Sequence, residues 1–343
     1  MWEQKSLPLL NHIHKNMKNL SAIASEIPFS EMEGIKTGNI TDEIAGTGLT
    51  LFHFPHGARA AVDVSGGGPA SRGTNVLDLA RNDTPLDALV FGGGSAFGLE
   101  AATGVERYLE ERGIGLNTGA ATVPIVVQSD IYDLSYGKSD VRPDAAMGYR
   151  ACQDAFYGGI PQSGSVGAGT GATIGKACGM KQSQKSGIGY AAYRIGNIKV
   201  GACVVVNSYG DIFDSGVKIA GMTTPDRKGF SSAEDALYGT VHSGNLFTDG
   251  QNTTIGAVFV NADFTREGLY KIAQMTRNAY ARCIRPVGTM ADGDTIYAVA
   301  AGKSLVRADI NVVGTLASRA MEAAILNAVK TSRMADSQFL ENL

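Results

Sequence analysis

Thr253 is the residue of this sequence whose type and surroundings best suit a nucleophile. It follows the polar run Asp249-Gly250-Gln251-Asn252 and begins the apolar run TTIGAVFV. If its hydroxyl attacks the carbonyl of Asn252, the amide becomes an ester, and hydrolysis of that ester frees the amine of Thr253. Such an α-amine has a pKa of about 8, so it accepts the proton of the neighbouring hydroxyl at neutral pH. The residues thus permit self-cleavage between Asn252 and Thr253, with Thr253 becoming an N-terminal nucleophile.

The same residues allow two other interpretations. Thr254 carries an identical hydroxyl one position later and competes for the role of nucleophile. Alternatively, the segment from Asn252 to Thr254 only leads into a strand, and its hydroxyl groups bond to nearby backbone atoms. Strand entrances of this kind are the commoner case, and the local pattern alone leaves all three interpretations open.

Other ways of activating a nucleophile find little support in the sequence. No Gly-x-Ser-x-Gly motif occurs, which argues against the serine elbow of the α/β-hydrolases. The histidines have no spacing that joins them to carboxylates or cysteines as metal ligands, so we expect no metal site. The five histidines are His12, His14, His53, His56 and His242.

The glycine-rich stretch GAGTGATIGKA at residues 167–177 resembles a phosphate-binding loop only superficially. That motif requires glycine where Thr170 stands and serine or threonine where Ala177 stands. The glycines also lack the spacing of a dinucleotide-binding turn. We therefore expect no nucleotide and no other cofactor.

Composition points to a globular protein that acts on small molecules or peptides. The chain has 343 residues, 44% of them hydrophobic, and its formal net charge of -3 comes from 30 basic and 33 acidic residues. Neither sign forms a long block, so the sequence carries no electrostatic footprint for nucleic acid or an anionic membrane.

Cysteine usage and the N-terminal residues predict a cytoplasmic protein. The cysteines include no Cys-x-x-Cys pair, and three of the four lie in apolar surroundings, which suits a reducing compartment. Residues 1–20 lack a basic leader with a continuous apolar stretch. No segment comes near the roughly 20 apolar residues of a membrane helix. The cysteines are Cys152, Cys178, Cys203 and Cys283.

Hydrophobic patterns predict an α+β protein with strands and helices in separate layers. The runs at 189–195 and 198–206 form a predicted hairpin, because Gly196-Asn197 suits a tight turn. Residues 208–252 are polar and lack sustained periodicity, which predicts a long loop. The other predicted strands cover 49–54, 58–64, 88–91, 124–134 and 294–302, with one more starting at Thr253. The predicted helices cover 96–112, 266–284 and 308–331.

Six stretches of the chain match, in the same order, segments of one known family. They are VDVSGGGPASRGTNVLDLARN (62–82), FGGGSAFGLEAATGVERYLEERG (91–113), VPIVVQSDIYDL (123–134), VGACVVVNSYGDIFD (200–214), NTTIGAVFVNADFT (252–265) and DGDTIYAVAAG (292–302). The sequence thereby resembles peptidase family S58, which contains the L-aminopeptidase/D-esterases, the β-peptidyl aminopeptidases and the nylon-oligomer hydrolases. The resemblance implies a four-layer αββα sandwich of the self-processing N-terminal-nucleophile type. It also implies a single domain of residues 1–343, cut into a large subunit 1–252 and a small subunit 253–343 that assemble further, often into tetramers.

The resemblance also implies roles for individual residues. The family pattern Asn-[Ser/Thr]-x-Ile matches residues 252–255, so Asn252 and Thr253 flank the processed bond and Thr253 is preferred over Thr254. Asn207 matches the asparagine whose side-chain amide helps to form the oxyanion hole. Tyr132 matches a tyrosine that lies near the substrate.

Three charged residues distinguish the branches of the family. The aminopeptidases usually carry Ser-x-Glu where this chain has Asp292-Gly293-Asp294, whereas the nylon-oligomer hydrolases carry Asp-Gly-Asp. The threonine nucleophile and Lys176 match the nylon-oligomer branch as well. In an extended chain Asp292 and Asp294 point to the same side, where both could hold the Thr253 amine. Lys176 is then expected to balance their charge and to position the Thr253 hydroxyl.

The resulting hypothesis is a hydrolase of linear amides such as 6-aminohexanoate (nylon) oligomers, acting through an acyl-enzyme. An aminopeptidase or β-aminopeptidase of the same family is the main alternative. A transferase that uses the same acyl-enzyme, and a non-catalytic binding protein on this fold, are further alternatives. The loops at 66–75 and 133–145 are expected to line the substrate pocket, and they do not reveal its ligand.

Overall fold

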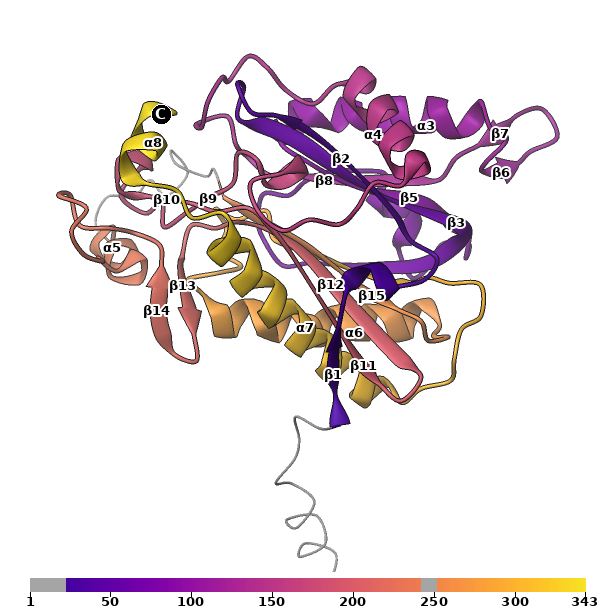
Figure 1. The fold of residues 1–343 in the computed structure, drawn as a ribbon. Helices are drawn as coiled ribbons and strands as arrows, with labels where there is room; N and C mark the ends of the chain where they lie inside the picture. The colour runs from indigo at the N-terminus through magenta and orange to yellow at the C-terminus, as the bar shows by residue number, and fades with distance from the viewer. Residues whose placement is uncertain (1–22, 242–251) are drawn as a thin grey trace, which may run out of the picture.

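The computed structural model describes residues 23–241 and 252–343, which Figure 1 shows as a ribbon. Its main sheet has ten strands in the order β1-β11-β12-β15-β17-β3-β5-β8-β4, with β2 paired to β3. The strands are β1 (Ser25–Ile27), β2 (Lys36–Asp42), β3 (Thr47–Val64), β4 (Ala70–Arg72), β5 (Leu86–Gly92), β6 (Leu116–Asn117), β7 (Thr122–Val123), β8 (Val126–Asp130), β9 (Thr173–Ile174), β10 (Gln184–Lys185), β11 (Ile188–Ile195), β12 (Ile198–Asn207), β13 (Asp211–Asp214), β14 (Val217–Ala220), β15 (Thr253–Val260), β16 (Ile284–Arg285) and β17 (Thr295–Ala300). The helices are α3 (Ala101–Glu110), α4 (Ala145–Tyr157), α5 (Ala233–Gly239), α6 (Arg266–Cys283), α7 (Ile310–Thr331) and α8 (Asp336–Glu341). Short 3₁₀ helices are η2 (Phe29–Glu31), η3 (Thr74–Leu77), η4 (Ser95–Glu100), η5 (Gly167–Gly169) and η6 (Met180–Gln182).

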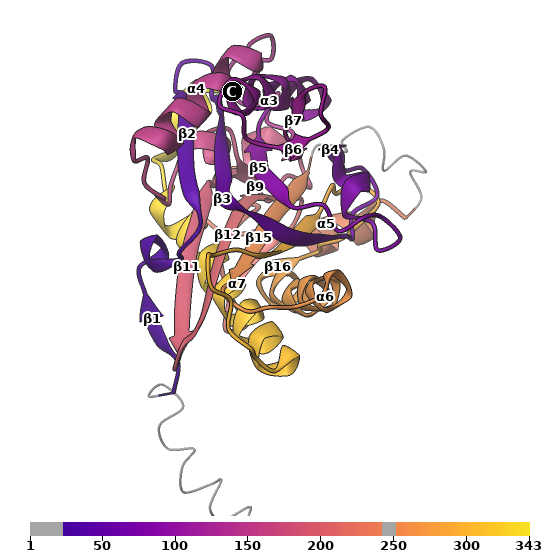
Figure 2. The ribbon, with the colours of Figure 1, turned by 90° about the vertical axis from the view of Figure 1, so that its right-hand side faces the viewer.

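The long strand β3 joins two halves of this sheet. Its first part pairs with β2 and β5, and its last six residues pair with β17. Between them the pairing register shifts from His53 to Ala58, around Gly57, whose φ of 68° lies in the left-handed region. Because β3 bends here, the two halves form separate layers, with α3 and α4 on one side and α6 and α7 on the other (Figures 1 and 2).

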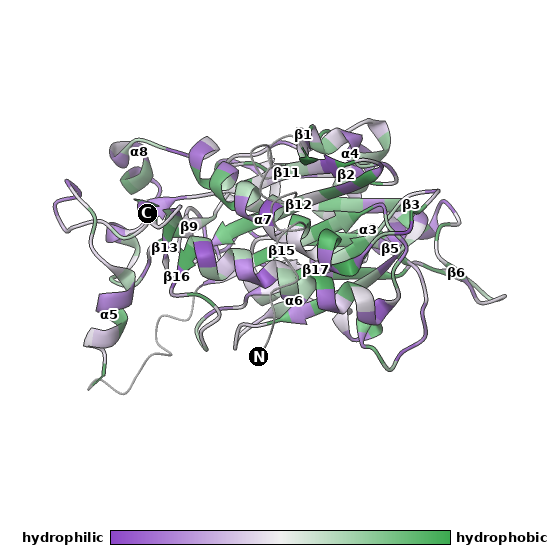
Figure 3. Ribbon diagram, turned by 90° about the horizontal axis from the view of Figure 1, so that it is seen from below, coloured by the Kyte–Doolittle hydropathy of each residue, from purple (hydrophilic) through white to green (hydrophobic). Residues whose placement is uncertain are grey.

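Alternating side chains along the central strands fill two cores at once. On β12, Val204 and Val206 pack in the cluster that contains α6 and α7, whereas Cys203 and Val205 point into the cluster between the sheets. A third cluster lies between β3, β5 and the helices α3 and α4. Figure 3 shows these apolar strands in the middle of the molecule. The four-layer αββα arrangement expected from the resemblance is thereby confirmed.

The predicted hairpin and the two long predicted helices are confirmed. Residues Ile195 and Ile198 pair across the turn between β11 and β12. Helix α6 ends at Cys283 and α7 ends at Thr331, each within two residues of its predicted end. Local periodicity is a strong signal here because one face of each helix is continuously buried.

Other predicted elements are wrong in ways that long-range contacts explain. Residues 49–54 and 58–64 form one bent strand, β3, instead of two strands. The predicted helix 96–112 begins as the 3₁₀ helix η4, where a Cβ on Gly98 would lie 1.9 Å from the Gly93 carbonyl oxygen, and becomes α-helical only at Ala101. The patterns also missed β2, α4 and α8.

The predicted loop 208–252 is only partly irregular. It contains β13, β14 and α5, and β13 pairs with β16, whose residue Arg285 lies far along the chain opposite Asp211. Helix α5 is capped by Ser232, whose side chain accepts a hydrogen bond from the Asp235 amide. The part from 242 to 251, including Asp249-Gly250-Gln251, lies outside the described residues.

Helix α7 corrects the expectation that no segment has the length and apolarity of a membrane span. Among the described residues it alone meets both criteria, with a mean hydropathy of 1.2, and 61% of its most apolar window is buried within the protein. Its apolar side chains, such as Met321 and Ile325, belong to the core beneath β11 and β12. The apolarity of α7 is that of a core helix.

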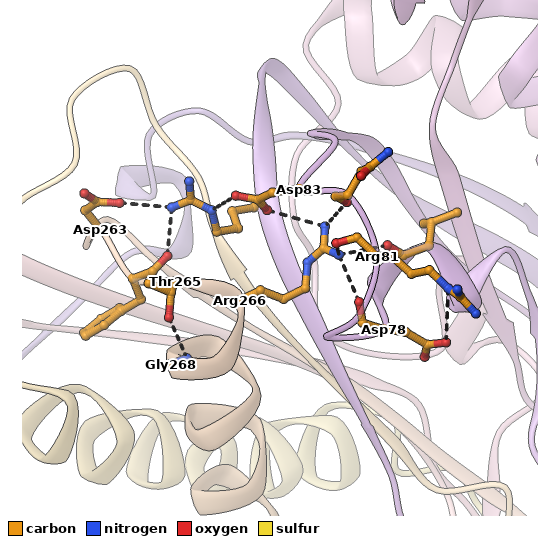
Figure 4. A network of polar contacts seen from close by, with 11 residues as sticks. Asp78, Arg81, Asp83, Asp263, Thr265, Arg266 and Gly268 are labelled. Atoms are coloured by element: carbon orange, nitrogen blue, oxygen red, sulfur yellow. Dashed lines mark hydrogen bonds and ion pairs between the residues drawn. The ribbon is translucent and has the colours of Figure 1, made fainter.

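A buried arginine at the start of α6 holds the loop that follows β4 (Figure 4). Arg266 is 5% exposed. Its guanidinium forms an ion pair with the Asp83 carboxylate at 3.4 Å. The same aspartate receives a 2.6 Å hydrogen bond from Arg59. The loop carbonyls that accept hydrogen bonds from Arg266 are those of Val76, Asp78, Arg81 and Asn82. Arg266 thereby fixes residues 76–83 to the N-terminus of α6.

Replacing Arg266 with methionine is expected to lower the free energy of unfolding by about 2 kcal/mol, because several loop carbonyls lose a buried charged donor. Urea denaturation followed by circular dichroism measures the change. Arg81→Met is the matched control, since the Arg81 side chain is 62% exposed, and we expect it to change stability by less than about 0.5 kcal/mol. Equal effects of the two substitutions would contradict this account.

Candidate active site

Thr253 begins β15 in the middle of the sheet, where its position is fixed from both sides. On one side it pairs with Asn207, the last residue of β12. On the other side the preceding residue, Asn252, forms a parallel bridge with Asp292. Thr253 is 4% exposed and Asn252 is 3% exposed, so the bond between them is buried. The sheet register thus gathers Asn207, Asn252, Thr253 and Asp292 at one place.

The carbonyl oxygen of Asn252 accepts two hydrogen bonds. The Thr253 Oγ1 hydroxyl donates to it at 2.6 Å, and the backbone amide of Gly293 donates to it at 2.9 Å. A Cβ atom on Gly293 would lie 2.7 Å from Thr253 Oγ1, which is too close for any side chain. The Gly293 amide is a contact that sequence reasoning missed, because a backbone donor leaves no mark on residue type.

The side chain of Asn207 is bonded at both ends of its amide. Its Oδ1 accepts hydrogen bonds from Lys176 Nζ at 2.8 Å and from the Thr173 amide at 3.1 Å. Its Nδ2 donates to the main-chain oxygen of Tyr132 at 2.9 Å. An amide nitrogen carries two hydrogens, so Nδ2 has a second one to offer to an oxyanion. The amide is held in one orientation, as an oxyanion donor requires.

Tyr132 contributes its backbone to this arrangement, and its side chain lines a small pocket beside Lys176. The tyrosine is half-buried. Its contact with substrate stays a prediction. The pocket is lined by Tyr132, Asp133, Ser135, Tyr136, Thr173, Lys176 and Met180.

Lys176 is buried among carboxylates at the edge of this pocket. Burial lowers the pKa of its ammonium to about 7, and the nearby carboxylates of Asp292, Asp133 and Asp294 oppose that shift. Near neutral pH the lysine is therefore present both as ammonium and as amine, and in either form Nζ can donate a hydrogen bond to Asn207 Oδ1. Asp133 is a further buried carboxyl group that the sequence analysis did not single out.

The two aspartates of the Asp292-Gly293-Asp294 turn are anchored by backbone and hydroxyl donors. Asp294 accepts hydrogen bonds from the amides of Thr254 at 2.7 Å and Gly288 at 2.8 Å. Asp292 accepts from the amide and the hydroxyl of Thr289 at 2.9 and 2.6 Å. Burial raises the pKa of Asp294, and the neighbouring carboxylate of Asp292 raises it further. Asp294 thus competes for protons at a higher pH than an exposed aspartate.

The arrangement of these groups is that of an amide hydrolase. A hydroxyl lies against a fixed carbonyl, two separate amide donors are available for oxyanions, and proton-exchanging groups lie close by. A family model, the one for peptidase family S58, matches residues 30–338. The chain belongs to peptidase family S58. It is therefore a hydrolase that acts on amide or peptide bonds.

The relatives of this chain include proteins named as aminopeptidases and proteins named as oligomer endohydrolases. The chain is 36% identical over 314 residues to an uncharacterized aminopeptidase of Mycobacterium leprae, covering 82% of each protein. It is 33% identical over 316 residues to the 6-aminohexanoate-oligomer endohydrolase of Paenarthrobacter ureafaciens, covering 88% of this chain and 85% of that protein.

Solved structures establish the fold. A β-aminopeptidase of Burkholderia sp. superimposes with a TM-score of 0.59 at 19% identity, covering 92% of this chain and 93% of that one. The L-aminopeptidase D-Ala-esterase/amidase of Ochrobactrum anthropi, described as a variant of the Ntn-hydrolase fold, gives a TM-score of 0.62 at 16% identity, covering 89% and 86%. The N-terminal-nucleophile fold predicted from the resemblance is confirmed.

Asp292→Asn is expected to move the acid limb of the pH–rate profile for cleavage of the bond between Asn252 and Thr253 to lower pH. The Asp292 carboxylate is one cause of the raised pKa of Asp294, so its removal lets Asp294 stay ionised in more acidic solution. Initial rates between about pH 5 and about pH 9 measure the limb. Asp263→Asn, at an exposed ion pair with Arg59, is the control and should leave the limb in place. A shift of the Asp292→Asn profile to higher pH would refute the assignment.

Proposed function

We propose that this protein is a self-cleaving amidohydrolase that uses Thr253 as an N-terminal nucleophile. The observation that carries the proposal is the carbonyl of Asn252, which accepts hydrogen bonds from both Thr253 Oγ1 and the Gly293 amide. The nucleophile already contacts the group that it must attack, and the oxygen that becomes negative already has a donor.

In self-cleavage, Thr253 Oγ1 bonds to the carbonyl carbon of Asn252, and its proton passes to a base. We assign this role to ionised Asp294, whose carboxylate accepts a hydrogen bond from the amide of the next residue, Thr254. The Gly293 amide stabilises the oxyanion on Asn252. The carbon–nitrogen bond then breaks, the Thr253 nitrogen takes up a proton, and an ester joins Asn252 to Thr253 Oγ1. Water hydrolyses this ester into the Asn252 carboxylate and the free Thr253 amine.

In turnover, the freed amine accepts the proton of the Thr253 hydroxyl as Oγ1 attacks the substrate carbonyl. Asn207 Nδ2 supplies the hydrogen bond to the new oxyanion, and Lys176 holds Asn207 in place. The leaving amine takes a proton, and an acyl ester remains on Thr253. Water attacks this ester with the amine as base, which releases the acid and restores the enzyme.

The sheet order supports the expectation that fragments 1–252 and 253–343 stay together. Strands β15 and β17, from the smaller fragment, lie between β12 and β3 of the larger fragment. Each side of this strand pair is a hydrogen-bonded ladder, and α6 and α7 share a core with β12. Breaking one peptide bond leaves these interactions intact.

For the substrate we propose linear amide oligomers of the 6-aminohexanoate type, cut at internal bonds. The Asp292-Gly293-Asp294 turn, Lys176 and the threonine nucleophile support this, as does the relative named as a 6-aminohexanoate-oligomer endohydrolase. The alternative is an aminopeptidase or β-aminopeptidase, which the name of the mycobacterial relative favours. We further propose a cytoplasmic enzyme that assembles into a tetramer of processed pairs.

Paired assays separate these possibilities. An endohydrolase cleaves an oligoamide whether its amino end is acetylated or free. An aminopeptidase cleaves only the oligoamide with the free amino end. Adding hydroxylamine or an amino acid as acceptor reveals a transferase, because the acyl group then appears on the acceptor. A non-catalytic binding protein neither cleaves itself nor turns over any of these amides.

Thr253→Ala is expected to abolish self-cleavage, because no hydroxyl remains to attack Asn252. Denaturing electrophoresis and mass spectrometry should find the wild type as fragments 1–252 and 253–343, and the variant as one chain. Thr254→Val is the matched control and should still cleave at the same bond. A wild-type protein that stays full length under every condition would contradict the proposal.

Gly293→Ala is expected to slow self-cleavage by at least about a hundredfold, because its Cβ would press on Thr253 Oγ1 at 2.7 Å and displace it. The time course of chain cleavage after synthesis measures the effect. Gly229→Ala is the control, since a Cβ there would meet only Thr224 Cγ2, at 3.8 Å. Normal cleavage by Gly293→Ala would show that the close approach of residue 293 does not position the nucleophile.

A further inference from the structure

The C-terminal helix α8 belongs to the smaller fragment of the proposed enzyme but packs on loops of the larger one. Figure 1 shows it near β9 and β10, beyond the end of α7. Phe339 of α8 is 1% exposed, and its ring stacks on that of Tyr136 with centroids 5.8 Å apart and planes 23° apart. The helix is thereby anchored on the segment that follows β8.

Two more contacts fasten the same segment to the C-terminal residues. The Gly137 amide donates a hydrogen bond to the main-chain oxygen of Asn342 at 2.8 Å. The Tyr136 hydroxyl approaches Met334 Sδ at 3.7 Å. Residues 334–342 therefore contact both the backbone of Gly137 and the side chain of Tyr136.

Arg227 joins α8 to a second part of the larger fragment. Its guanidinium donates to the Asp336 carboxylate at 2.5 Å and lies 5.3 Å from the centre of the Phe339 ring. It also donates to the carbonyls of Lys181 at 2.7 Å and Ser183 at 3.0 Å. Its φ of 56° is in the left-handed region, which a residue with a side chain rarely adopts, so the contacts hold it in place.

The segment held by α8 lies beside the candidate active site. Tyr136 lines the small pocket beside Lys176, together with Tyr132. The main-chain oxygen of Tyr132 accepts the hydrogen bond that orients Asn207 Nδ2. A shift of residues 132–136 would therefore alter both the pocket wall and the oxyanion donor.

We propose that α8 is a latch that positions residues 132–137 for substrate, with Phe339 as its positioning residue. The inference rests on the proposed function, because it assigns this segment to substrate binding. None of the contacts described for Thr253, Asn252 and Gly293 involves α8. The latch should therefore affect the hydrolysis of added substrate and leave self-cleavage unchanged.

Phe339→Ala tests the latch, with Leu340→Ala as the matched control, because Leu340 is 42% exposed on the same helix. Both variants should cleave themselves as completely as the wild type. Only Phe339→Ala should raise KM for an oligoamide, or lower kcat/KM, by about tenfold to a hundredfold. Phe339→Tyr keeps the ring and should restore most of the activity. Asp336→Asn, which weakens the contact with Arg227, should act in the same direction with a smaller effect.

Hydrogen exchange supplies a readout that does not depend on activity. In Phe339→Ala the amides of residues 131–138 should exchange faster, while those of β15 keep their protection. The latch is overturned if Phe339→Ala matches Leu340→Ala in kinetics and exchange. It is also overturned if self-cleavage, hydrolysis and thermal stability fall together, as for a general loss of structure. Failure of the wild type itself to cleave or hydrolyse would instead refute the proposed function and, with it, the role of α8.

Discussion

The hydrogen-bonded carbonyl of Asn252 is the point on which the candidate site depends. Thr253 Oγ1 reaches it from β15 and the Gly293 amide reaches it from the turn before β17, so its geometry requires this strand and this turn to be in register. Residue 293 in this turn must be glycine, because a side chain there would collide with the Thr253 hydroxyl. A chemically ordinary threonine becomes a candidate nucleophile through this placement.

Burial of charge is the second constraint. Lys176, Asp292 and Asp294 are almost fully enclosed, and an isolated charge there would be very unfavourable. Each has hydrogen-bonding partners, and their pKa values shift toward one another, since burial lowers that of Lys176 and raises those of both aspartates. Burial thus brings the pKa values of Lys176 and Asp294 both to about 7.

The bent strand β3 gives the site its enclosure. Its two halves belong to the two layers of the main sheet, and the nucleophile lies buried in the middle of that sheet. The wall that contains Tyr132 and Tyr136 is built from one such loop, and it is supported from outside by the last helix of the chain. Strands therefore position Thr253 and Asn252, and a loop that packs against the last helix lies beside them.

The sequence by itself determined the features that depend on local pattern: the hairpin at Gly196-Asn197, the long helices α6 and α7, and the apolar strand that starts at Thr253. The family pattern added the candidate site residues, among them Asn207 and Lys176. Only the tertiary structure decided that the Gly293 amide meets the Asn252 carbonyl, that β3 is one bent strand, and that α8 supports the pocket wall. These depend on backbone groups and on partners far apart in the chain, and neither residue type nor local periodicity records such contacts.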